Sequence, residues 1–304
     1  MEIASDGRGK EAVVSSGGVV VARLPYIVCK RFGLLRVVGM PTLSHVLGPV
    51  FTPAALAGKG SQTVKLYGLI GELLRQLPRA SHTAFRLHPG LTDTLAFAAA
   101  GFHCAAEFTV LVKPAAEDIL WRNMRDKTRN GIRRAAERLT VSEMDDMDVF
   151  LDFYEENLRR KGEHNRYQRR LVRSLIVQCL ERDAGRLLVA ADANSVHSAM
   201  FTVWDADTEY YFMSTRRADA HNGAVSLLLW EALQAAALAG RTFDMDGLHV
   251  VGDKTPNLLL LTGFGGAVVP LFHVQRSGLL LQLGRVMGQS WDRRRECQPT
   301  AEVD

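Results

Sequence analysis

In the last third of the chain, the spacing of hydrophobic and polar residues is in turn that of a helix and that of a strand. Over residues 223–238 the apolar positions recur at the 3.6-residue spacing of a helix that is covered on one side. Gly240 then stands where a helix commonly ends in a left-handed residue. The pattern predicts a unit of helix, strand, helix and strand, over residues 223–239, 242–245, 257–261 and 267–274.

The first hundred residues predict a series of shorter elements. Residues 1–18 mix charges with glycine and predict a flexible leader. The next two segments, 19–30 and 34–38, are rich in β-branched residues and predict a hairpin. A helix that Pro78 ends, a strand, a short helix and a further strand are expected after them, over residues 65–77, 85–88, 91–100 and 107–112.

A sharp change of composition at Pro114 predicts a boundary. After it, residues 117–139 read as one long amphipathic helix. Two more helices and three successive strands are expected to follow, over residues 145–160, 168–182, 186–191, 198–205 and 208–215. We therefore expect a reduced first domain at 19–114, a second domain at 115–285 and a flexible tail at 286–304.

Basic residues gather on one side of the predicted helix 117–139. Arg122, Arg125, Arg129 and Arg133 fall within about a quarter turn of one another at 100° per residue. A second basic group, 159–161, lies in the turn between the next two helices. Both groups fit the binding of phosphates, either of RNA or of a nucleotide-bearing substrate, because arginine can hold phosphate with two donors. A solvated helix surface is the alternative.

Composition and charge narrow the class of protein. The chain has 304 residues, of which 47% are hydrophobic and 23% charged, with a formal net charge of +4. These values are typical of a globular chain of one large or two modest domains. The apolar runs are too short to span a bilayer, so we expect a cytoplasmic protein without a membrane span. Four cysteines without a CxxC spacing favour free thiols over a zinc site or a disulfide framework.

Five motifs in the second half resemble those of a known superfamily. Trp121, Lys127, Arg129, Ile132, Arg133 and Ala135 match a helix of the pattern W-x(n)-K-x-R-x-x-I-R-x-A. Further matches are Gly185-Arg186-Leu187, the helix segment 228–232, Gly240 with Phe243-Asp244 and Gly247, and Gly263-Phe264-Gly265. Together they resemble the GNAT acyltransferases, and more closely the FemAB group of peptidoglycan-branching enzymes and their relatives.

The resemblance implies a fold and an activity. The fold would be α/β (α+β), with two tandem GNAT-like domains, each a mixed and mostly antiparallel sheet flanked by helices. The activity would be N-acyl transfer, in which an activated acyl group forms an amide with an amine. In the FemAB group the donor is an aminoacyl-tRNA, whereas ordinary GNAT members use acyl-CoA. Neither reaction needs a metal or a bound cofactor, so the donor is a co-substrate.

The donor loop departs from the pattern of CoA-binding members. These members hold pyrophosphate on a loop of the form R/Q-x-x-G-x-G/A that leads into a helix, because exposed amides at a helix start bind anions. Here the corresponding residues 221–226 read HNGAVS, and Val225 stands where the second glycine is expected. This departure disfavours CoA and favours a tRNA acceptor stem as the partner. The donor-binding residues we expect are Arg129, Arg133, Arg160, Arg217, His221, Asn222 and Gly223.

Asp246 is the leading candidate for the proton acceptor, because it follows a strand end beside Gly247. Tyr211 lies on the strand that faces this site in the resembled fold. The FemAB lysine of the F-K-x-G-F-G motif is absent from residues 260–265, and Lys254 is the alternative cation. Asp244 and His249 are the candidates for binding the acceptor, a small-molecule or cell-envelope-precursor amine. Structural roles remain open for each of these residues.

Three interpretations remain open from the sequence. The first is a FemAB-like aminoacyltransferase, and the second is an acyl-CoA-dependent N-acyltransferase that acts on a small amine. The third is a catalytically inactive GNAT-like binding module. Nucleophile motifs, a P-loop and metal-ligand spacings such as HExxH do not occur in the sequence.

Overall fold

The structure is a computed structural model that describes residues 9–31, 35–57, 61–165, 167–248 and 257–278. It divides the chain into two compact units, Met1–Glu107 with Pro270–Asp304, and Phe108–Val269. The strands β6 and β12 contribute residues to both, so the division lies within these strands and not at Pro114. None of the described helices is long and apolar enough to cross a bilayer.

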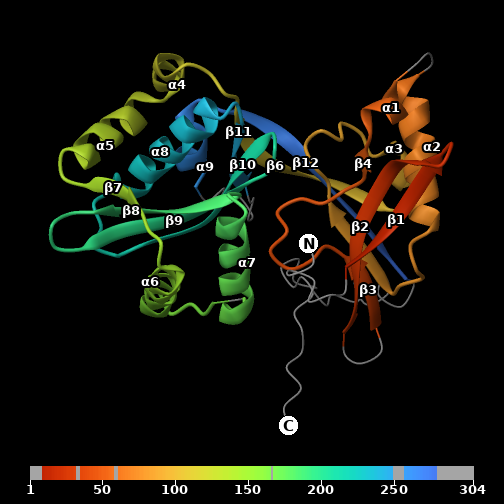
Figure 1. The fold of residues 1–304 in the computed structure, drawn as a ribbon, viewed down its shortest axis with the longest axis horizontal. Coiled ribbons are helices and arrows are strands. Elements are labelled where there is room, and N and C mark those ends of the chain that lie inside the picture. Colours follow the sequence, from red (N-terminus) through yellow and green to blue (C-terminus); the bar gives the residue numbers. More distant parts are fainter. Residues whose placement is uncertain (1–8, 32–34, 58–60, 166, 249–256, 279–304) are drawn as a thin grey trace, which may run out of the picture. The chain divides into compact units, whose positions relative to one another are not determined.

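The first unit is a mixed sheet with helices packed on it (Figure 1). Its strand order is β1-β2-β3-β5-β12, where β3 and β5 are parallel and the other neighbours antiparallel. Leu73, Phe85 and Phe97 are fully buried in its core. The elements are β1 (Gly9–Ser16), β2 (Val19–Arg31), β3 (Leu35–Gly39), β4 (Val50–Phe51), α1 (Pro53–Leu56), α2 (Gln62–Arg75), β5 (His82–Arg86), α3 (Leu95–Ala99) and β12 (Ala267–Ser277).

The hairpin predicted in the first unit is confirmed by the pairing of β2 with β3. The expected flexible leader is wrong for Gly9–Ser16, because these residues pair along β2 and bury Ala12 and Val14. The last strand also differs from expectation, since residues 273–277 of β12 pair with β5 of the first unit. Cys104 and Cys179 are free thiols, as expected.

The second unit contains the described residues that the sequence points to as site candidates. Its strand order is β6-β11-β10-β9-β8-β7, with one parallel pair, β10 and β11. The elements are β6 (His103–Val112), α4 (Glu117–Asn123), α5 (Asp126–Ala136), β7 (Thr140–Glu143), α6 (Met147–Arg160), α7 (Arg169–Glu181), β8 (Gly185–Ala191), β9 (Val196–Trp204), β10 (Thr208–Arg216), α8 (Ala224–Leu238), β11 (Thr242–Leu248) and α9 (Leu258–Leu261), followed by a 3₁₀ turn (Thr262–Phe264). Both sheets are thus mixed and mostly antiparallel, as predicted.

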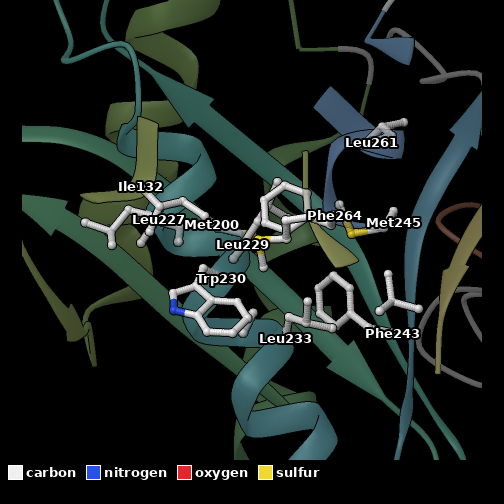
Figure 2. Packing of buried hydrophobic residues seen from close by; sticks show 14 of the residues in the cluster. Ile132, Met200, Leu227, Leu229, Trp230, Leu233, Phe243, Met245, Leu261 and Phe264 are labelled. Carbon is white, nitrogen blue, oxygen red and sulfur yellow. The ribbon is translucent and has the colours of Figure 1, made fainter. Parts of the chain in front are cut away.

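Helix α8 is the centre of the main core of this unit. Leu229, Leu233 and Ala236 are almost completely buried, and Figure 2 shows α8 side chains packed against Met200, Phe243 and Phe264. Helices α4 and α5 share this core, while α6 and α7 lie on the opposite side of the sheet (Figure 1). Four consecutive residues, Leu227–Trp230, are buried, so α8 is covered on more sides than the single side expected from the sequence.

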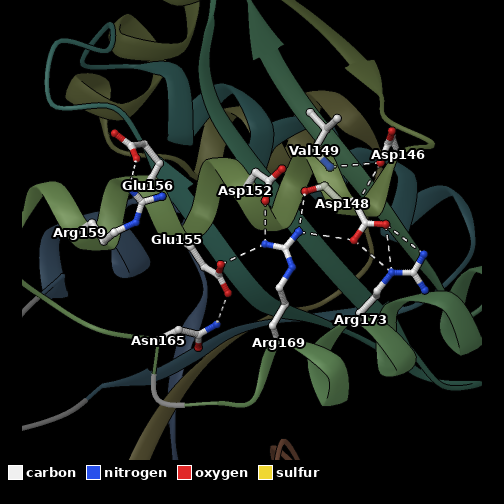
Figure 3. A network of polar contacts seen from close by, with 10 residues as sticks. All are labelled: Asp146, Asp148, Val149, Asp152, Glu155, Glu156, Arg159, Asn165, Arg169 and Arg173. Atoms are coloured by element: carbon white, nitrogen blue, oxygen red, sulfur yellow. Dashed lines mark hydrogen bonds and ion pairs between the residues drawn. The ribbon is translucent and has the colours of Figure 1, made fainter.

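Ion pairs join α6 to α7 on that opposite side (Figure 3). Arg169 contacts Asp148, Asp152 and Glu155, and Arg173 contacts Asp148. Hydrogen bonds from Arg173, opposed by partial burial, lower the pKa of the Asp148 carboxyl. The pairs are partly exposed, so each adds little stability, but as a network they align the two helices.

The single helix predicted over residues 117–139 is wrong, because it is two helices, α4 and α5. Met124 and Arg125 between them have extended backbone. The Arg125 N–H donates to the Gly263 carbonyl at 3.0 Å, and a Cβ on Gly265 would lie 2.5 Å from the Asn123 carbonyl oxygen. The glycine segment therefore packs into the break and takes a hydrogen bond that a continuous helix would make internally.

Candidate active site

The parallel pairing of β10 with β11 is short. It covers three residue pairs and ends at Tyr210 opposite Asp244. Both strands continue past this point in the described chain, β10 bonded to β9 and β11 bonded to β6. From Tyr211 onward β10 therefore has a backbone edge towards β11 without ladder bonds, and such an edge can bind an extended ligand.

Asp246 lies at a bulge in β11, directly after the pairing with β10 ends. The register with β6 shifts between Asp244 and Gly247, and Asp246 has a φ of +76°, a strained value for a residue with a side chain. Two hydrogen bonds hold it there. Its N–H donates to Asp244 at 3.1 Å, and its carbonyl accepts from the Thr109 hydroxyl at 2.9 Å. The carboxylate accepts the Gly247 N–H at 2.6 Å and remains partly exposed.

Asp244 shapes this bulge from inside the protein. Its side chain is fully buried, and it accepts hydrogen bonds from the Thr109 hydroxyl and from the Asp246 N–H. We expected Asp244 to contact the acceptor. A carboxylate with no accessible surface cannot make that contact in this structure, so its role is to fix the backbone of Asp246.

Tyr211 stands on β10 close to Asp246. Tyr211 directly follows Tyr210, which pairs with Asp244, so the register brings it next to the bulge that carries Asp246. Burial raises the pKa of Tyr211 to about 12, the hydrogen bond with the Ser214 hydroxyl opposes this rise, and the negative charge of Asp246 adds to it. The phenol is therefore neutral at physiological pH and carries a proton that it can donate.

Two histidines organise the loop between β10 and α8. His197 Nδ1 accepts the His221 backbone N–H at 3.0 Å, so its Nε2 carries the proton and donates to Asp192 at 2.9 Å. This bond and backbone N–H bonds hold the pKa of Asp192 down at about 2. His221 Nδ1 in turn accepts the Gly223 N–H at 3.1 Å. Two amides of the predicted donor loop are thus bonded to imidazoles.

Gly223 is buried where α8 begins and touches α5. A Cβ on Gly223 would lie 2.3 Å from the Gly131 carbonyl oxygen, so the close approach of the two helices requires glycine here. We expected Gly223 to allow phosphate to approach, but the structure shows that it accommodates α5. Asn222, beside it, is exposed.

The predicted donor-binding arginines are engaged with neighbouring groups. Arg129 donates to the Trp121 and Arg122 carbonyls at the end of α4 and pairs with Asp126. Arg133 lies over the Trp121 ring, 5.2 Å from its centre. Arg160 pairs with Glu156 at 2.8 Å, and Arg217 binds Asp219 through two bonds of 2.9 and 2.8 Å. The structure therefore distributes these residues over separate contacts and does not gather them at one site.

Two other predicted residues, His249 and Lys254, lie outside the described residues. Within the described ranges, no group of three or more His, Cys, Asp or Glu side chains could hold a metal ion. Two open hollows occur elsewhere in this unit. One is lined by Glu117, Asp118, Trp121 and Trp230, and the other lies between the end of β6, α4 and the start of β12.

Comparisons with known proteins agree with this geometry. Residues 122–253 match the family model of an acetyltransferase (GNAT) domain. The chain contains a GNAT acyltransferase domain. No curated protein matches the sequence.

Solved structures extend the likeness of fold beyond the GNAT domain. FemX superposes with a TM-score of 0.65 at 11% identity, covering 92% of this chain and 90% of that one. The C-terminal domain of a protein described as a lysylphosphatidylglycerol synthetase, from Agrobacterium fabrum, gives 0.60 at 14%, covering 93% and 89%. A tandem GNAT protein from the clavulanic acid biosynthesis pathway gives 0.52 at 13%, covering 88% and 83%. The fold is therefore the FemX-like tandem GNAT fold.

Sequence reasoning missed several residues of the GNAT domain that shape its site. Thr109 reaches Asp244 and Asp246 from a neighbouring strand 135 and 137 positions away in sequence. His197 and Asp192 reach the donor loop from the β8–β9 hairpin. A threonine within a strand and a histidine after a turn give no spacing signal. Only the short pairing of β10 and β11 reveals what they support.

Proposed function

We propose that this GNAT protein is an aminoacyltransferase that moves an aminoacyl group from aminoacyl-tRNA to a primary amine. The observation that carries the proposal is the end of the β10–β11 pairing, with Asp246 and Tyr211 directly beyond it. The fold likeness to FemX and to a protein described as a lysylphosphatidylglycerol synthetase supports aminoacyl transfer. A cell-envelope precursor is the acceptor class that we propose.

The residues next to this position supply the groups that amide formation needs. Asp246 attracts the ammonium of the acceptor and takes a proton from it, and the amine nitrogen then attacks the carbonyl carbon. Backbone N–H groups on the open edge of β10 donate to the oxygen as it gains negative charge. When the carbon–oxygen ester bond breaks, Tyr211 donates its proton to the departing ribose oxygen, and the resulting phenolate takes the second proton that the new amide nitrogen must lose.

The hydrogen bonds of the β10–α8 loop favour aminoacyl-tRNA over acyl-CoA. Pyrophosphate binding at a helix start needs backbone N–H groups that point at the ligand. Here the His221 and Gly223 N–H groups donate to imidazole nitrogens, and the Ala224 N–H donates to the His221 carbonyl. An acyl-CoA donor would have to break these bonds, whereas a tRNA acceptor end needs no pyrophosphate site.

Transfer from charged tRNA tests this function. The protein is incubated with tRNA carrying radiolabelled amino acids and with a panel of primary amines, and label in amide products is measured. Replacing Asp246 with asparagine should lower the rate by about 10²–10⁴-fold, the usual contribution of a proton acceptor. Asparagine adopts positive φ readily, so the variant should fold normally. A variant with the native rate would exclude Asp246 as the acceptor of the proton.

A further inference from the structure

Apart from Lys161 and Arg170 on the α6 and α7 side of the sheet, four exposed cations of the GNAT domain have no partner among the described residues. They are Lys127, Arg134 and Arg138 along α5 and the turn after it, and Arg216 at the end of β10. None of them makes a hydrogen bond, an ion pair or a ring contact with any residue that the structure describes. We call this group the cation cluster.

Neighbouring arginines differ from the cation cluster because each is already neutralised or hydrogen-bonded. Arg122 pairs with Asp118 at 2.8 Å, Arg159 and Arg160 with Glu156, and Arg217 with Asp219. Arg134, in the last turn of α5, and Arg138, in the turn after it, have no such partner among the described residues. Cations without a partner among the described residues can bind an anion that comes from outside the chain.

The cluster members on α5 flank the start of α8. The Gly131 carbonyl of α5 is the atom that Gly223 approaches. Lys127 is four residues before Gly131 and Arg134 is three after it, so both lie on the same side of α5, one turn to either side. Their side chains therefore flank the contact between α5 and the first residue of the donor loop's helix.

Arg216 reaches the same region from the sheet. It pairs with Ser198, and Ser214 pairs with Met200, whose side chain is in the core beneath α8. Side chains two apart in a strand share a face, so Arg216 lies on the face that α5 and α8 cover. The open edge of β10 leads from Tyr211 to Arg216, about 16 Å at 3.3 Å per residue.

We propose that the cation cluster binds backbone phosphates of the RNA that carries the aminoacyl group. This inference rests on the proposed function and adds the surface that holds the carrier. With the carbonyl beside Asp246 and Tyr211, the carrier leaves along β10 and meets Arg216, then Lys127, Arg134 and Arg138. Side-chain cations thus bind the phosphates, because the amides of the loop are already hydrogen-bonded to imidazoles.

Binding of an uncharged RNA hairpin with a single-stranded 3′ end tests the cluster without acyl transfer. Fluorescence anisotropy is measured from 50 to 200 mM KCl on the native protein and on Lys127→Gln/Arg134→Gln/Arg138→Gln/Arg216→Gln. Four lost phosphate contacts should lower the slope of log affinity against log salt by about 3, because each contributes about 0.7–0.9. Affinity at 100 mM should fall at least about tenfold.

Arg182 is likewise engaged, since it donates to the Gln178 carbonyl at 3.1 Å. The matched control removes four engaged charges, Arg122→Gln/Arg159→Gln/Arg160→Gln/Arg182→Gln, and should keep most of the native slope. Equal losses in both variants would show an effect of net charge alone and overturn the proposal. Displacement of RNA by micromolar CoA would assign the cluster to a nucleotide, and binding to phosphatidylglycerol vesicles in place of RNA would assign it to a membrane surface. Both results would overturn it.

Melting temperatures equal to that of the native protein show that the variants are folded. Should the fourfold variant melt early, Arg134→Gln/Arg216→Gln should lose about half as much slope. If this double variant binds RNA with the affinity and salt slope of the native protein, the proposal is equally overturned. Failure here is distinguishable from failure of the proposed function, because transfer with Asp246→Asn is measured separately and needs no intact cluster.

Discussion

At the scale of single residues, the site depends on one strained position. Asp246 keeps a positive φ because Asp244 and Thr109 hold its backbone from both sides. Strain of this kind persists where surrounding contacts overdetermine it, and it clusters at functional sites. The sequence could single out Asp246 as a candidate because it stands beside a glycine at the end of a predicted strand. It could not predict that Asp244 is fully buried, because its burial depends on contacts such as that with Thr109, which lies 135 positions away in the sequence.

The pKa of Tyr211 leads to a prediction about pH. Its folded value, about 12, lies above the unfolded value of about 10, so the protonated form is favoured by folding. The associated stability is present below pH 10 and is lost as pH rises through 12. Tyr211→Phe should therefore remove a phenol that titrates near 12 in ultraviolet absorbance, with transfer slowed across pH 7–10. If the substitution instead removes a phenol that titrates near pH 10, the buried position of Tyr211 is contradicted.

At the scale of elements, the crossing of α5 and α8 fixes the start of the donor loop's helix. The helical spacing predicted the position of α8, but not that Leu227–Trp230 would be buried in succession and the helix covered nearly all round. The break between α4 and α5 could not be predicted, since it depends on a carbonyl of Gly263 more than 130 residues away. Tertiary contacts of this kind override a local pattern.

The helix crossing is tested by a pair of glycine substitutions. Gly223→Ala puts a methyl group against the Gly131 carbonyl and should destabilise the protein by about 1–3 kcal/mol. Gly131→Ala meets nothing within 4 Å and should stabilise the helix by about 0.5–1 kcal/mol. Denaturant unfolding of both variants measures the difference. Equal effects of the two substitutions would mean that the helices do not touch at Gly223.

A buried ion pair joins the inner strands of the same sheet. Glu209 is fully buried and accepts hydrogen bonds from Arg186 at 2.6 Å and from Thr202 at 2.8 Å. Arg186→Met leaves this carboxylate without a counter-charge and should cost about 3–5 kcal/mol. The double variant Arg186→Met/Glu209→Leu should recover most of that loss. Additive losses in urea unfolding would show that the two side chains do not interact.

At the scale of the whole molecule, the two units repeat one pattern of strand pairing. Each sheet has a run of antiparallel neighbours, one parallel pair and one further antiparallel neighbour. The motifs of the second half pointed to this tandem GNAT fold. The order of elements along the chain does not reveal that residues of β12 complete the sheet of the first unit, because strand partners are chosen by tertiary packing and not by chain order.

The central claim is that the second unit takes an aminoacyl group from tRNA and joins it to an amine. The most direct test compares two radiolabelled donors side by side, aminoacyl-tRNA and acyl-CoA, with the native protein and the same panel of primary amines. Label should enter amide products from aminoacyl-tRNA, and acyl-CoA should give no more than the rate without protein. Label that enters from acyl-CoA alone would contradict this claim.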